Sequence, residues 1–307
     1  MTARRLLLTG RTGFVGQVLR GLVEREPAYN LQERAPSGRM ELRERESLLR
    51  GIEEIRPHYV IHLAAQSFVP RALENPRETL EINLMGTLNL LEALRQAKFS
   101  GRLLYVGSGD EYGLIEAAKL PVREDHPLRP RNPYAVSKAA AEMLCYQWAQ
   151  TEKLDIVMAR PFNHIGPGQD ERFAISAFAK QLAEIRLGRR PAKIEVGNLE
   201  VSRDFSDVED VARAYLLLLG KGKSGDVYNV CSGNEHGLKE LLTRLIELAD
   251  IDVDVVLDPA RQRPAEQSRM VGDHRRLTEH TGWEPEVSID RSLEGILAYW
   301  EHKLKNE

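Results

Sequence analysis

The feature that most constrains the fold of this chain is a glycine-rich turn near its N-terminus. An apolar run at residues 6–8 leads directly into this turn, and apolar residues then recur with helical spacing over residues 14–26. The turn reads Thr9-Gly10-Arg11-Thr12-Gly13-Phe14-Val15-Gly16. Glycines spaced in this way allow a sharp turn, a close approach of the backbone to a phosphate and tight packing of the helix on the strand. Because a helix N-terminus also attracts anions, the segment predicts a site for the pyrophosphate of a dinucleotide.

Short apolar runs alternate with longer amphipathic stretches through the first half of the chain. Further strands are expected at residues 59–64, 103–106 and 156–159, and helices at residues 80–97 and 133–151. Strands that are apolar along their whole length and alternate with helices indicate a parallel sheet covered on both faces. We therefore predict an α/β fold with a Rossmann-type, doubly wound parallel sheet.

This alternation breaks after residue 163, where glycine and proline cluster at Gly166-Pro167-Gly168. A helix and a strand expected between residues 207 and 233 could still rejoin the first sheet. We therefore expect a Rossmann domain and a smaller C-terminal α/β region. The Rossmann domain would comprise residues 1–163 with 207–233, and the smaller region residues 164–206 and 234–307.

Composition excludes several classes of protein. Of the 307 residues, 42% are hydrophobic and 29% are charged, and the formal net charge is −3. This charge gives no electrostatic basis for binding nucleic acid, and no apolar run is long enough to cross a bilayer. Cys145 and Cys231 lie far apart in apolar contexts and the histidines are scattered, so we expect buried free thiols and no metal site. We expect no signal peptide after Met1, and hence a cytoplasmic location.

The sequence leaves the choice between NADH and NADPH open. Residues 26–39, where a second strand should end in an acidic residue, contain two prolines and no convincing apolar run. That strand is therefore either degenerate or part of a mobile segment. Arg11 would favour the 2′-phosphate of NADP slightly, although an exposed loop arginine explains it equally well. Glu41, which follows the gap, is a candidate for binding the adenine amino group.

A tyrosine and a lysine four residues apart form a candidate acid–base unit. Asn132 is expected to cap a helix and Pro133 to occupy its first turn, which puts Tyr134 and Lys138 on one helical face. A tyrosine with a pKa near 10 needs a shift of about three units, or roughly 4 kcal/mol, to exchange protons near neutral pH. A lysine ammonium about 4 Å away supplies an interaction of that size at an effective dielectric constant near 20. A surface Tyr/Lys pair is the simpler explanation of the pattern by itself.

Ser108 is a candidate for holding a substrate oxygen. It comes just after the strand expected at residues 103–106. Ligands bind at the carboxyl ends of strands in such sheets, so a hydroxyl there could hydrogen-bond a substrate carbonyl. The alternative is an ordinary turn residue.

Taken together, these segments resemble the extended short-chain dehydrogenase/reductases along nearly the whole chain. The resemblance also rests on His62-Leu63-Ala64-Ala65-Gln66, on Asn83 with Gly86-Thr87, and on Arg160-Pro161-Phe162-Asn163. It implies that Ser108, Tyr134 and Lys138 are catalytic. It implies that Asn83 holds a kink in the active-site helix and a proton-relay water. It further implies a cofactor groove formed by the glycine turn together with Leu63, Ala64, Ala65, Tyr134 and Lys138.

The second half resembles one branch of that family, the branch that acts on GDP-mannose derivatives. The matching segments are Asn163-His164-Ile165-Gly166-Pro167-Gly168-Gln169, Gly197-Asn198-Leu199-Glu200, Arg203-Asp204-Phe205, Arg263-Pro264-Ala265-Glu266 and Gly282-Trp283. Arginines suit a diphosphate through paired donors, and Glu266 would bind the guanosine ribose. The substrate contacts implied by the resemblance are Asp110, Asn163, Val196, Arg203, Arg263 and Glu266.

That branch contains a dehydratase that makes GDP-4-keto-6-deoxymannose and a reductase that converts this ketone to GDP-rhamnose. In the dehydratase pattern a glutamate stands two residues after the catalytic hydroxyl residue, whereas this chain has Asp110 there and Glu111 should point elsewhere. Since catalytic geometry tolerates errors of only about 1 Å, the shorter carboxylate favours the reductase, with NADPH or NADH as reductant. The dehydratase, another nucleotide-sugar enzyme such as an epimerase, and a non-enzymatic dinucleotide-binding protein are the alternatives.

The expected partners are a GDP-linked 4-keto-6-deoxy sugar and a second copy of the chain, with no nucleic acid and no membrane. The helices at residues 80–97 and 133–151 resemble those that pair in family dimers through a four-helix interface. Leu88, Leu91 and Ala93 lie outside one narrow apolar stripe, which indicates a second buried face. Burial within the monomer is the other explanation of that pattern.

Overall fold

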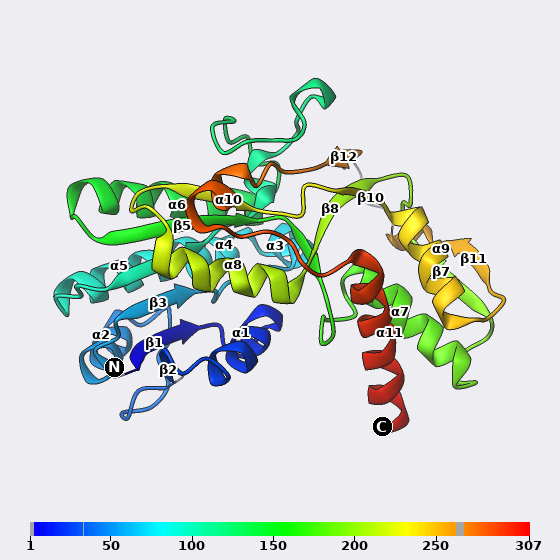
Figure 1. Ribbon diagram of the computed structural model, residues 1–307, viewed down its shortest axis with the longest axis horizontal. Helices are drawn as coiled ribbons and strands as arrows, with labels where there is room; N and C mark the ends of the chain where they lie inside the picture. The colour runs from blue at the N-terminus through cyan, green and yellow to red at the C-terminus, as the bar shows by residue number, and fades with distance from the viewer. Residues whose placement is uncertain (1–2, 33, 262–266) are drawn as a thin grey trace.

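The computed structural model describes residues 3–32, 34–261 and 267–307. The chain forms two lobes, seen at the left and right of Figure 1. The larger lobe consists of an open sheet and the helices on its two faces. The smaller lobe contains helices α7, α9 and α11 with the strands beside them, and it holds the C-terminus.

A parallel sheet of six strands organises the larger lobe in the described part of the chain. Its strand order is β2-β1-β3-β4-β5-β9, and every neighbouring pair is parallel. The strands are β1 (Arg4–Thr9), β2 (Tyr29–Gln32), β3 (Tyr59–His62), β4 (Arg102–Val106), β5 (Asp155–Pro161) and β9 (Val227–Val230). The predicted fold class is therefore confirmed. The order changes direction at β1 and β3, where sheets of this kind bind ligands.

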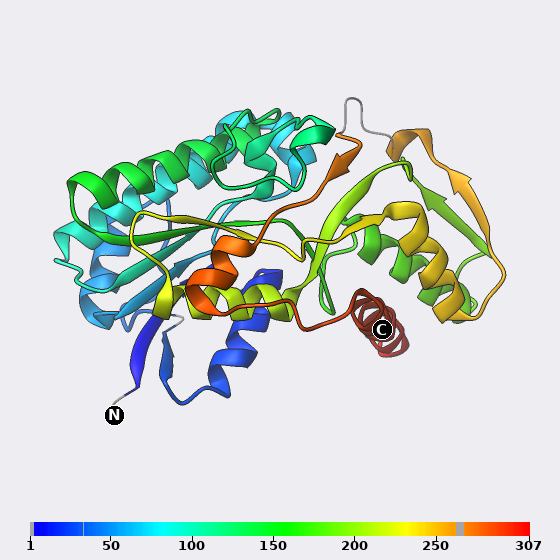
Figure 2. The same ribbon diagram turned by 45° about the horizontal axis from the view of Figure 1, so that its top comes forward.

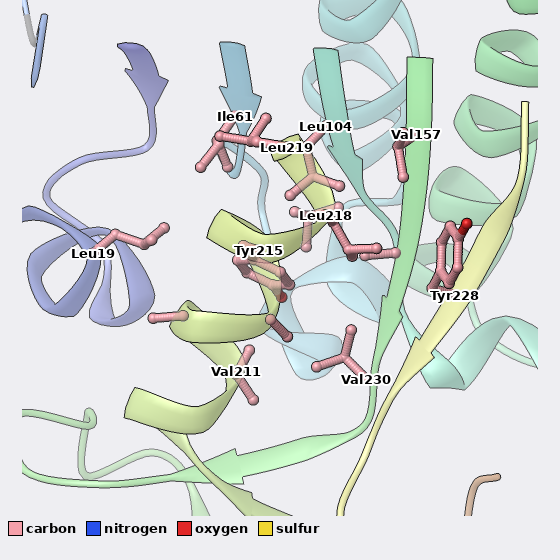
Figure 3. Packing of buried hydrophobic residues seen from close by; sticks show 14 of the residues in the cluster. Leu19, Ile61, Leu104, Val157, Val211, Tyr215, Leu218, Leu219, Tyr228 and Val230 are labelled. Atoms are coloured by element: carbon pink, nitrogen blue, oxygen red, sulfur yellow. The ribbon is translucent and has the colours of Figure 1, made fainter. Parts of the chain in front are cut away.

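Helices cover both faces of this sheet. On one face, Leu19 of the first helix and Val211, Tyr215 and Leu218 of α8 pack against apolar side chains of β3, β4 and β5, as Figure 3 shows. The helices on this face are α1 (Phe14–Glu24), α8 (Val208–Lys221) and α10 (Arg275–Thr281). On the opposite face lie α2 (Arg45–Ile55), α5 (Gly86–Gln96) and α6 (Pro133–Thr151). Both cores are dominated by apolar side chains excluded from water, the main source of folding free energy.

The smaller lobe is built from short strands and three helices, and Figure 2 shows it beside the end of the large sheet. Its helices α7 (Ala174–Arg186), α9 (Leu238–Ala249) and α11 (Ile289–Lys305) enclose a separate apolar core. Strand β8 (Ser202–Asp207) pairs with β6 (Asn163–Ile165), β10 (Glu235–Gly237) and β12 (Arg269–Met270). Strand β7 (Lys193–Val196) pairs with β11 (Asp254–Leu257).

Two elements differ from the sequence-based expectation. Strand β2 was not predicted, because it is an edge strand that pairs with β1 and has only exposed or half-buried side chains. The helix expected at residues 80–97 begins with a π-helical segment, η1 (Glu81–Met85), before α5 starts. Such segments often mark functional sites. Two short helices, α3 (Val69–Glu74) and α4 (Pro76–Leu80), precede it.

The apolar residues outside the main stripe of α5 are buried within the chain itself. Leu91 and Ala93 are fully buried, in a cluster that includes Leu48 and Ile52 of α2. The pattern that suggested a second interface on this helix is therefore explained by packing within the monomer.

The remaining short helical turns lie in loops: η2 (Gly109–Tyr112), η3 (Ala117–Lys119) and η4 (Pro259–Arg261). In the part of the chain that the structure describes, no helix has both the length and the apolar character needed to cross a bilayer. Within the same residues, no three histidine, cysteine or acidic side chains are placed to hold a metal ion together.

Candidate active site

The glycine turn adopts the close packing that its sequence predicts. Gly10 has φ of +75°, and a Cβ at this residue would lie 2.7 Å from the backbone nitrogen of Ala64. A Cβ at Gly16 would lie 2.4 Å from the carbonyl oxygen of Gly10, so the helix can approach the strand only with glycine there. The turn is therefore pressed against the loop that follows β3, which holds Leu63, Ala64 and Ala65.

The first turn of α1 has the features of an anion site. Gly13 is its N-cap residue, and no side chain caps this helix end. The amide groups of a helix N-terminus carry a partial positive charge and bind phosphate groups. Arg11 and Thr12 belong to the same turn, and Arg11 is half-buried. The turn therefore fits the pyrophosphate of a dinucleotide.

A chain of hydrogen bonds through His62 connects this turn to the active-site helices. Burial lowers the pKa of His62 to about 3, so the imidazole is neutral near pH 7. Thr87 Oγ1 donates to the Asn83 carbonyl (2.6 Å), so it accepts from His62 Nε2 (3.1 Å). His62 Nδ1 then accepts from Thr9 Oγ1 (2.8 Å), which itself accepts from the Ala64 amide (3.2 Å). One tautomer of the histidine satisfies the whole chain.

Asn83 continues this connection toward Tyr134. Its side chain accepts from the Gln66 amide (2.8 Å) and donates to the Gln66 carbonyl (2.9 Å) and to Ser137 Oγ (2.9 Å). Ser137 in turn donates to the carbonyl of Tyr134 (2.6 Å). Asn83 lies inside the π-helical segment η1, so the segment and the loop after β3 are both fixed to α6.

The first turn of α6 presents Tyr134 and Lys138 as expected. Asn132 caps the helix by accepting the Ala135 amide (2.8 Å), and Pro133 occupies its first position. Lys138 is buried, with 5% of its surface exposed, and its Nζ donates to the carbonyl of Val106 (2.6 Å). Burial lowers the pKa of Lys138 to about 8. The ammonium is therefore held at the carboxyl end of β4, by the residue two positions before Ser108.

The pKa of Tyr134 departs from the expectation drawn from the sequence. Tyr134 is half-buried, and burial together with the negative charge of Asp110 raises its pKa above the usual value. The Ser108 side chain opposes this shift. In the chain without bound ligands, burial and Asp110 set the direction of the Tyr134 pKa, and it is opposite to the lowering expected from Lys138. Tyr134 is therefore kept in its protonated form.

Ser108 is the N-cap residue of the 3₁₀ turn η2, and hydrogen bonds with Asp110 and Glu111 of that turn hold it in place. Its hydroxyl accepts the Asp110 amide (3.2 Å), and its own amide donates to Glu111 Oε1 (2.7 Å). Asp110 is exposed beside Tyr134, whereas Glu111 is fully buried. The side chain of Glu111 thus points away from the site, as the sequence predicted.

The structure brings some of the expected sugar contacts to one sheet of the smaller lobe. Asn163 of β6 pairs with Phe205 of β8, two residues after Arg203, so the side chains of Asn163 and Arg203 lie on the same face. Asn163 is exposed and Arg203 is half-buried. Arg203 Nη1 donates to the carbonyl of Ser202 (2.8 Å).

In the described part of the chain, the structure does not bring the other predicted contact residues to this sheet face. The side chain of Val196 is buried in the core of the smaller lobe, because Ile194 and Val196 share the inward face of β7, so the predicted contact of Val196 with substrate would have to use its backbone. Glu41 forms an ion pair with Arg39 (2.7 Å). Arg263 and Glu266 lie outside the described residues.

Comparison with known proteins agrees with this geometry. The family model described as GDP-mannose 4,6 dehydratase matches residues 20–296. The chain belongs to this family of extended short-chain dehydrogenase/reductases. This family member is 47% identical to the GDP-6-deoxy-D-mannose reductase of Pseudomonas aeruginosa, over 99% of both chains.

Two further comparisons show how this similarity to a reductase compares with the similarity to a dehydratase. The structure of RMD from Pseudomonas aeruginosa complexed with NADPH superposes with a TM-score of 0.93 and 48% identity, covering 98% of this chain and 100% of that one. GDP-mannose 4,6 dehydratase 2 of Arabidopsis thaliana is 32% identical over 82% of this chain and 68% of the plant protein. Similarity to the reductase is thus both higher and more complete.

Proposed function

We propose that this protein is a reductase that uses NADPH to convert the C4 ketone of GDP-4-keto-6-deoxy-D-mannose to the alcohol of GDP-D-rhamnose. The observation that carries the proposal is the placement of Tyr134, which is half-buried in the first turn of α6 and lies one helical turn before the buried Lys138. A protonated phenol is the form that reduction of a ketone requires as its acid. The full-length similarity to a GDP-6-deoxy-D-mannose reductase supports the same substrate.

The residues around the glycine turn fit a bound nicotinamide dinucleotide. Gly10, Gly13 and Gly16 leave room where any Cβ would meet backbone atoms within 3.2 Å. We propose that Thr12, Phe14 and Val15 line the pyrophosphate, that Arg11 binds the 2′-phosphate, and that Leu63, Ala64 and Ala65 line the groove beside it. The relative solved with NADPH supports this choice of cofactor. When bound, NADPH supplies the hydride that reduces C4.

The residues of the chain itself perform the proton chemistry. Tyr134 donates its proton to the oxygen of the C4 ketone, and the Ser108 hydroxyl donates a hydrogen bond to the same oxygen as negative charge develops there. The Lys138 ammonium stabilises the phenolate left on Tyr134, and its burial strengthens that interaction because little water screens it. Asp110, exposed beside Tyr134, is placed to contact the sugar.

The dehydratase reaction is the alternative within the same family. It requires a base that removes a proton next to a transient ketone, and Asp110 stands at the position of the glutamate that serves in the dehydratase pattern. Its carboxylate is one methylene shorter, a displacement large enough to cost much of the rate.

We assign the two substrates to different parts of the chain. Residues 1–163 with 207–233 would bind the dinucleotide, and residues 164–206 and 234–307 the GDP-sugar. Arg203 and Arg263, with Asn163 at the boundary between the two parts, would contact the diphosphate, and Glu266 the guanosine ribose. Cys145 and Cys231 are both buried and free, which is consistent with a cytoplasmic enzyme.

We also propose a homodimer formed through α6. Met143 and Tyr146 on this helix are 59% and 53% exposed, and Val136, about two turns before Met143, is 42% exposed. Met85, 47% exposed, lies on the adjacent η1 segment. An apolar face shared by neighbouring helices suits a self-complementary four-helix contact with a second copy.

The first experiment measures NADPH absorbance during incubation with GDP-4-keto-6-deoxy-D-mannose, with NADH in parallel. We expect steady loss of NADPH and the appearance of GDP-D-rhamnose by chromatography. No loss, together with conversion of GDP-mannose to the ketone without added reductant, would establish the dehydratase instead.

The dimer is tested separately by light scattering on the eluted protein. Met143→Glu should halve the measured mass, whereas Val255→Glu, at an exposed apolar residue of β11 in the smaller lobe, should leave it unchanged. A monomeric mass for the unaltered protein would contradict the proposal.

A further inference from the structure

Behind the proposed catalytic residues lies a buried group of two carboxyls and one guanidinium. Glu111 of η2, Glu142 of α6 and Arg160 of β5 are exposed over only 0%, 6% and 4% of their surfaces. The three come from different elements of the larger lobe and meet beneath Ser108. Two acidic groups thus share a single arginine in a place that water does not reach.

Arg160 forms a bidentate ion pair with Glu142. Its Nε and Nη2 donate to the two oxygens of that carboxylate, at 2.9 Å and 2.6 Å, in the paired geometry that suits a carboxylate. Its Nη1 donates to the Tyr112 hydroxyl (2.8 Å) and to the Glu124 carbonyl (3.2 Å). Glu111 Oε2 lies 3.7 Å from the Arg160 Nε, beyond a hydrogen bond.

One oxygen of Glu111 therefore has no donor. Oε2 is buried and makes no hydrogen bond to any donor among the described residues. A buried ionised oxygen without a donor is costly, whereas a carboxylic acid at the same place can donate its own proton. Glu142 is the acidic group beside this oxygen, since the same Arg160 Nε lies 2.9 Å from Glu142 Oε2 and 3.7 Å from Glu111 Oε2. Burial and the charge of Glu142 raise the pKa of Glu111 well above its usual range, in agreement with a protonated acid.

The other oxygen of Glu111 holds Ser108. Oε1 accepts the Ser108 amide at 2.7 Å, and this contact closes the η2 turn. A Cβ at Gly107 would lie 2.4 Å from the same oxygen, so the glycine before Ser108 makes room for the carboxyl group. The segment Gly107-Ser108-Gly109-Asp110-Glu111 therefore forms a tight turn in which the Glu111 carboxyl group binds the Ser108 amide.

We propose that Glu111 is a positioning residue that acts as a neutral carboxylic acid, accepting the Ser108 amide with one oxygen and donating its proton to Glu142 with the other. The effect on turnover that follows rests on the function proposed above; the protonation state does not.

A neutral Glu111 has a consequence for Lys138. The charged and titratable groups that face Glu111 are Glu142, Lys138, Cys145 and Tyr134 of α6, Arg160 of β5, and Tyr105 of β4. Glu142 and Arg160 cancel each other. With Glu111 protonated, no negative charge on that carboxyl opposes the effect of the Lys138 ammonium on the phenolate that forms at Tyr134 during the reaction. An ionised Glu111 would weaken that effect.

Two substitutions of Glu111 separate these possibilities. Glu111→Gln keeps an acceptor for the Ser108 amide and a donor for Glu142, so kcat should stay within about twofold and the pH profile of kcat should not move. Glu111→Leu removes both contacts; kcat should fall about tenfold or more, with a smaller change in KM, because Ser108 is no longer fixed. A glutamine variant as impaired as the leucine variant would overturn the proposal. So would an alkaline limb shifted to lower pH in the glutamine variant, which would reveal an ionised Glu111 supporting the Lys138 charge.

The protonation state itself is read without any substrate. Infrared difference spectra of the protein with carboxyl-labelled glutamate, unaltered minus Glu111→Gln, should contain a protonated carboxyl band at pH 7. A carboxylate band in its place would overturn the proposal. Because this measurement needs no turnover, a protein that failed to reduce the GDP-linked ketone would refute the proposed function and leave the assignment of Glu111 standing.

Discussion

The two lobes hold their functional side chains in different ways. In the larger lobe, His62, Asn83 and Lys138 are almost fully buried, at 2%, 2% and 5% exposure, and each is fixed by hydrogen bonds of defined direction. In the smaller lobe, Asn163 is exposed and Arg203 is half-buried, whereas Asp204, next to Arg203, is buried.

The difference matches the tasks proposed for the two lobes. Proton and hydride transfer lose much of their rate when the reacting atoms are displaced by about 1 Å, which calls for buried and directional support. A diphosphate is bound by long cationic side chains that adjust to it, and these can remain exposed until the ligand arrives. Substitutions in the larger lobe should therefore change kcat or cofactor affinity, and those in the smaller lobe should change KM and stability.

The largest effect on turnover is expected from Tyr134→Phe. Loss of the proton donor should lower kcat by roughly 10²–10⁴-fold, while the Kd for NADPH stays within about twofold because the ring and Lys138 remain. Steady-state rates and fluorescence of the bound cofactor measure the two quantities. Tyr299→Phe, at a half-buried tyrosine of α11 in the smaller lobe, is the control and should be unaffected. Unaltered turnover in Tyr134→Phe would remove this residue from its proposed role.

Gly10→Ala tests how closely the glycine turn must pack. The added Cβ would lie 2.7 Å from the Ala64 nitrogen at a residue with φ of +75°, so the turn has to shift. We expect the Kd for NADPH to rise by about tenfold or more, as measured by titration calorimetry. Gly21→Ala in α1 is the matched control, because nothing lies within 4 Å of its Cβ. It should raise the free energy of unfolding by about 0.5–1 kcal/mol and leave the Kd unchanged.

This contrast between the lobes also governs what the sequence could predict. The glycine turn, Tyr134 and Lys138 were predictable because their spacing is dictated by local geometry, the sharp turn and the helical repeat. Strand β2 was not, because an edge strand with half-buried side chains carries little apolar signal. The burial of Val196 follows from the core of the smaller lobe, to which distant helices contribute, and no local pattern contains that information.

The role of Glu111 and the direction of the Tyr134 pKa shift could not be predicted from the sequence either. The segment around Ser108 indicated only that Glu111 should point elsewhere. What it meets there, Arg160 and Glu142, is supplied by β5 and α6, which become neighbours only in the folded sheet. Similarly, the spacing of Tyr134 and Lys138 suggested a lowered tyrosine pKa, but burial and Asp110 shift it upward.

The pH dependence of kcat should report Lys138. Its pKa is lowered to about 8 by burial, so the ammonium is present below that pH and is lost above it. The Tyr134 phenol, with its raised pKa, stays protonated through the same range. With saturating NADPH, kcat should be constant near neutral pH and fall about tenfold by one pH unit above the Lys138 value. A kcat that does not change up to pH 10 would contradict a role for this charge.

Asp204→Asn should have the smallest effect on turnover and a clear effect on stability. The Asp204 carboxylate accepts from the Ser232 amide (2.8 Å), the Ser232 hydroxyl (2.7 Å), the Gly233 amide (2.9 Å) and the Gly272 amide (3.2 Å). These contacts join β8, next to Arg203, to the segments that follow β9 and β12. Asparagine would turn an NH₂ group toward some of these donors, so the free energy of unfolding should fall by about 3 kcal/mol in denaturant titrations.

The same carboxylate distinguishes support for the lobe junction from support for the reaction. Ser232→Ala removes one of its four donors and leaves the charge in place, so its loss of stability should be about 1 kcal/mol. If Asp204 acts only on the smaller lobe, both variants should raise the KM for the GDP-linked ketone by a few fold and leave kcat and the Kd for NADPH unchanged. A fall in kcat comparable with that of Glu111→Leu would mean that the smaller lobe also fixes the geometry of the reacting atoms, and the contrast between the two lobes would have to be abandoned.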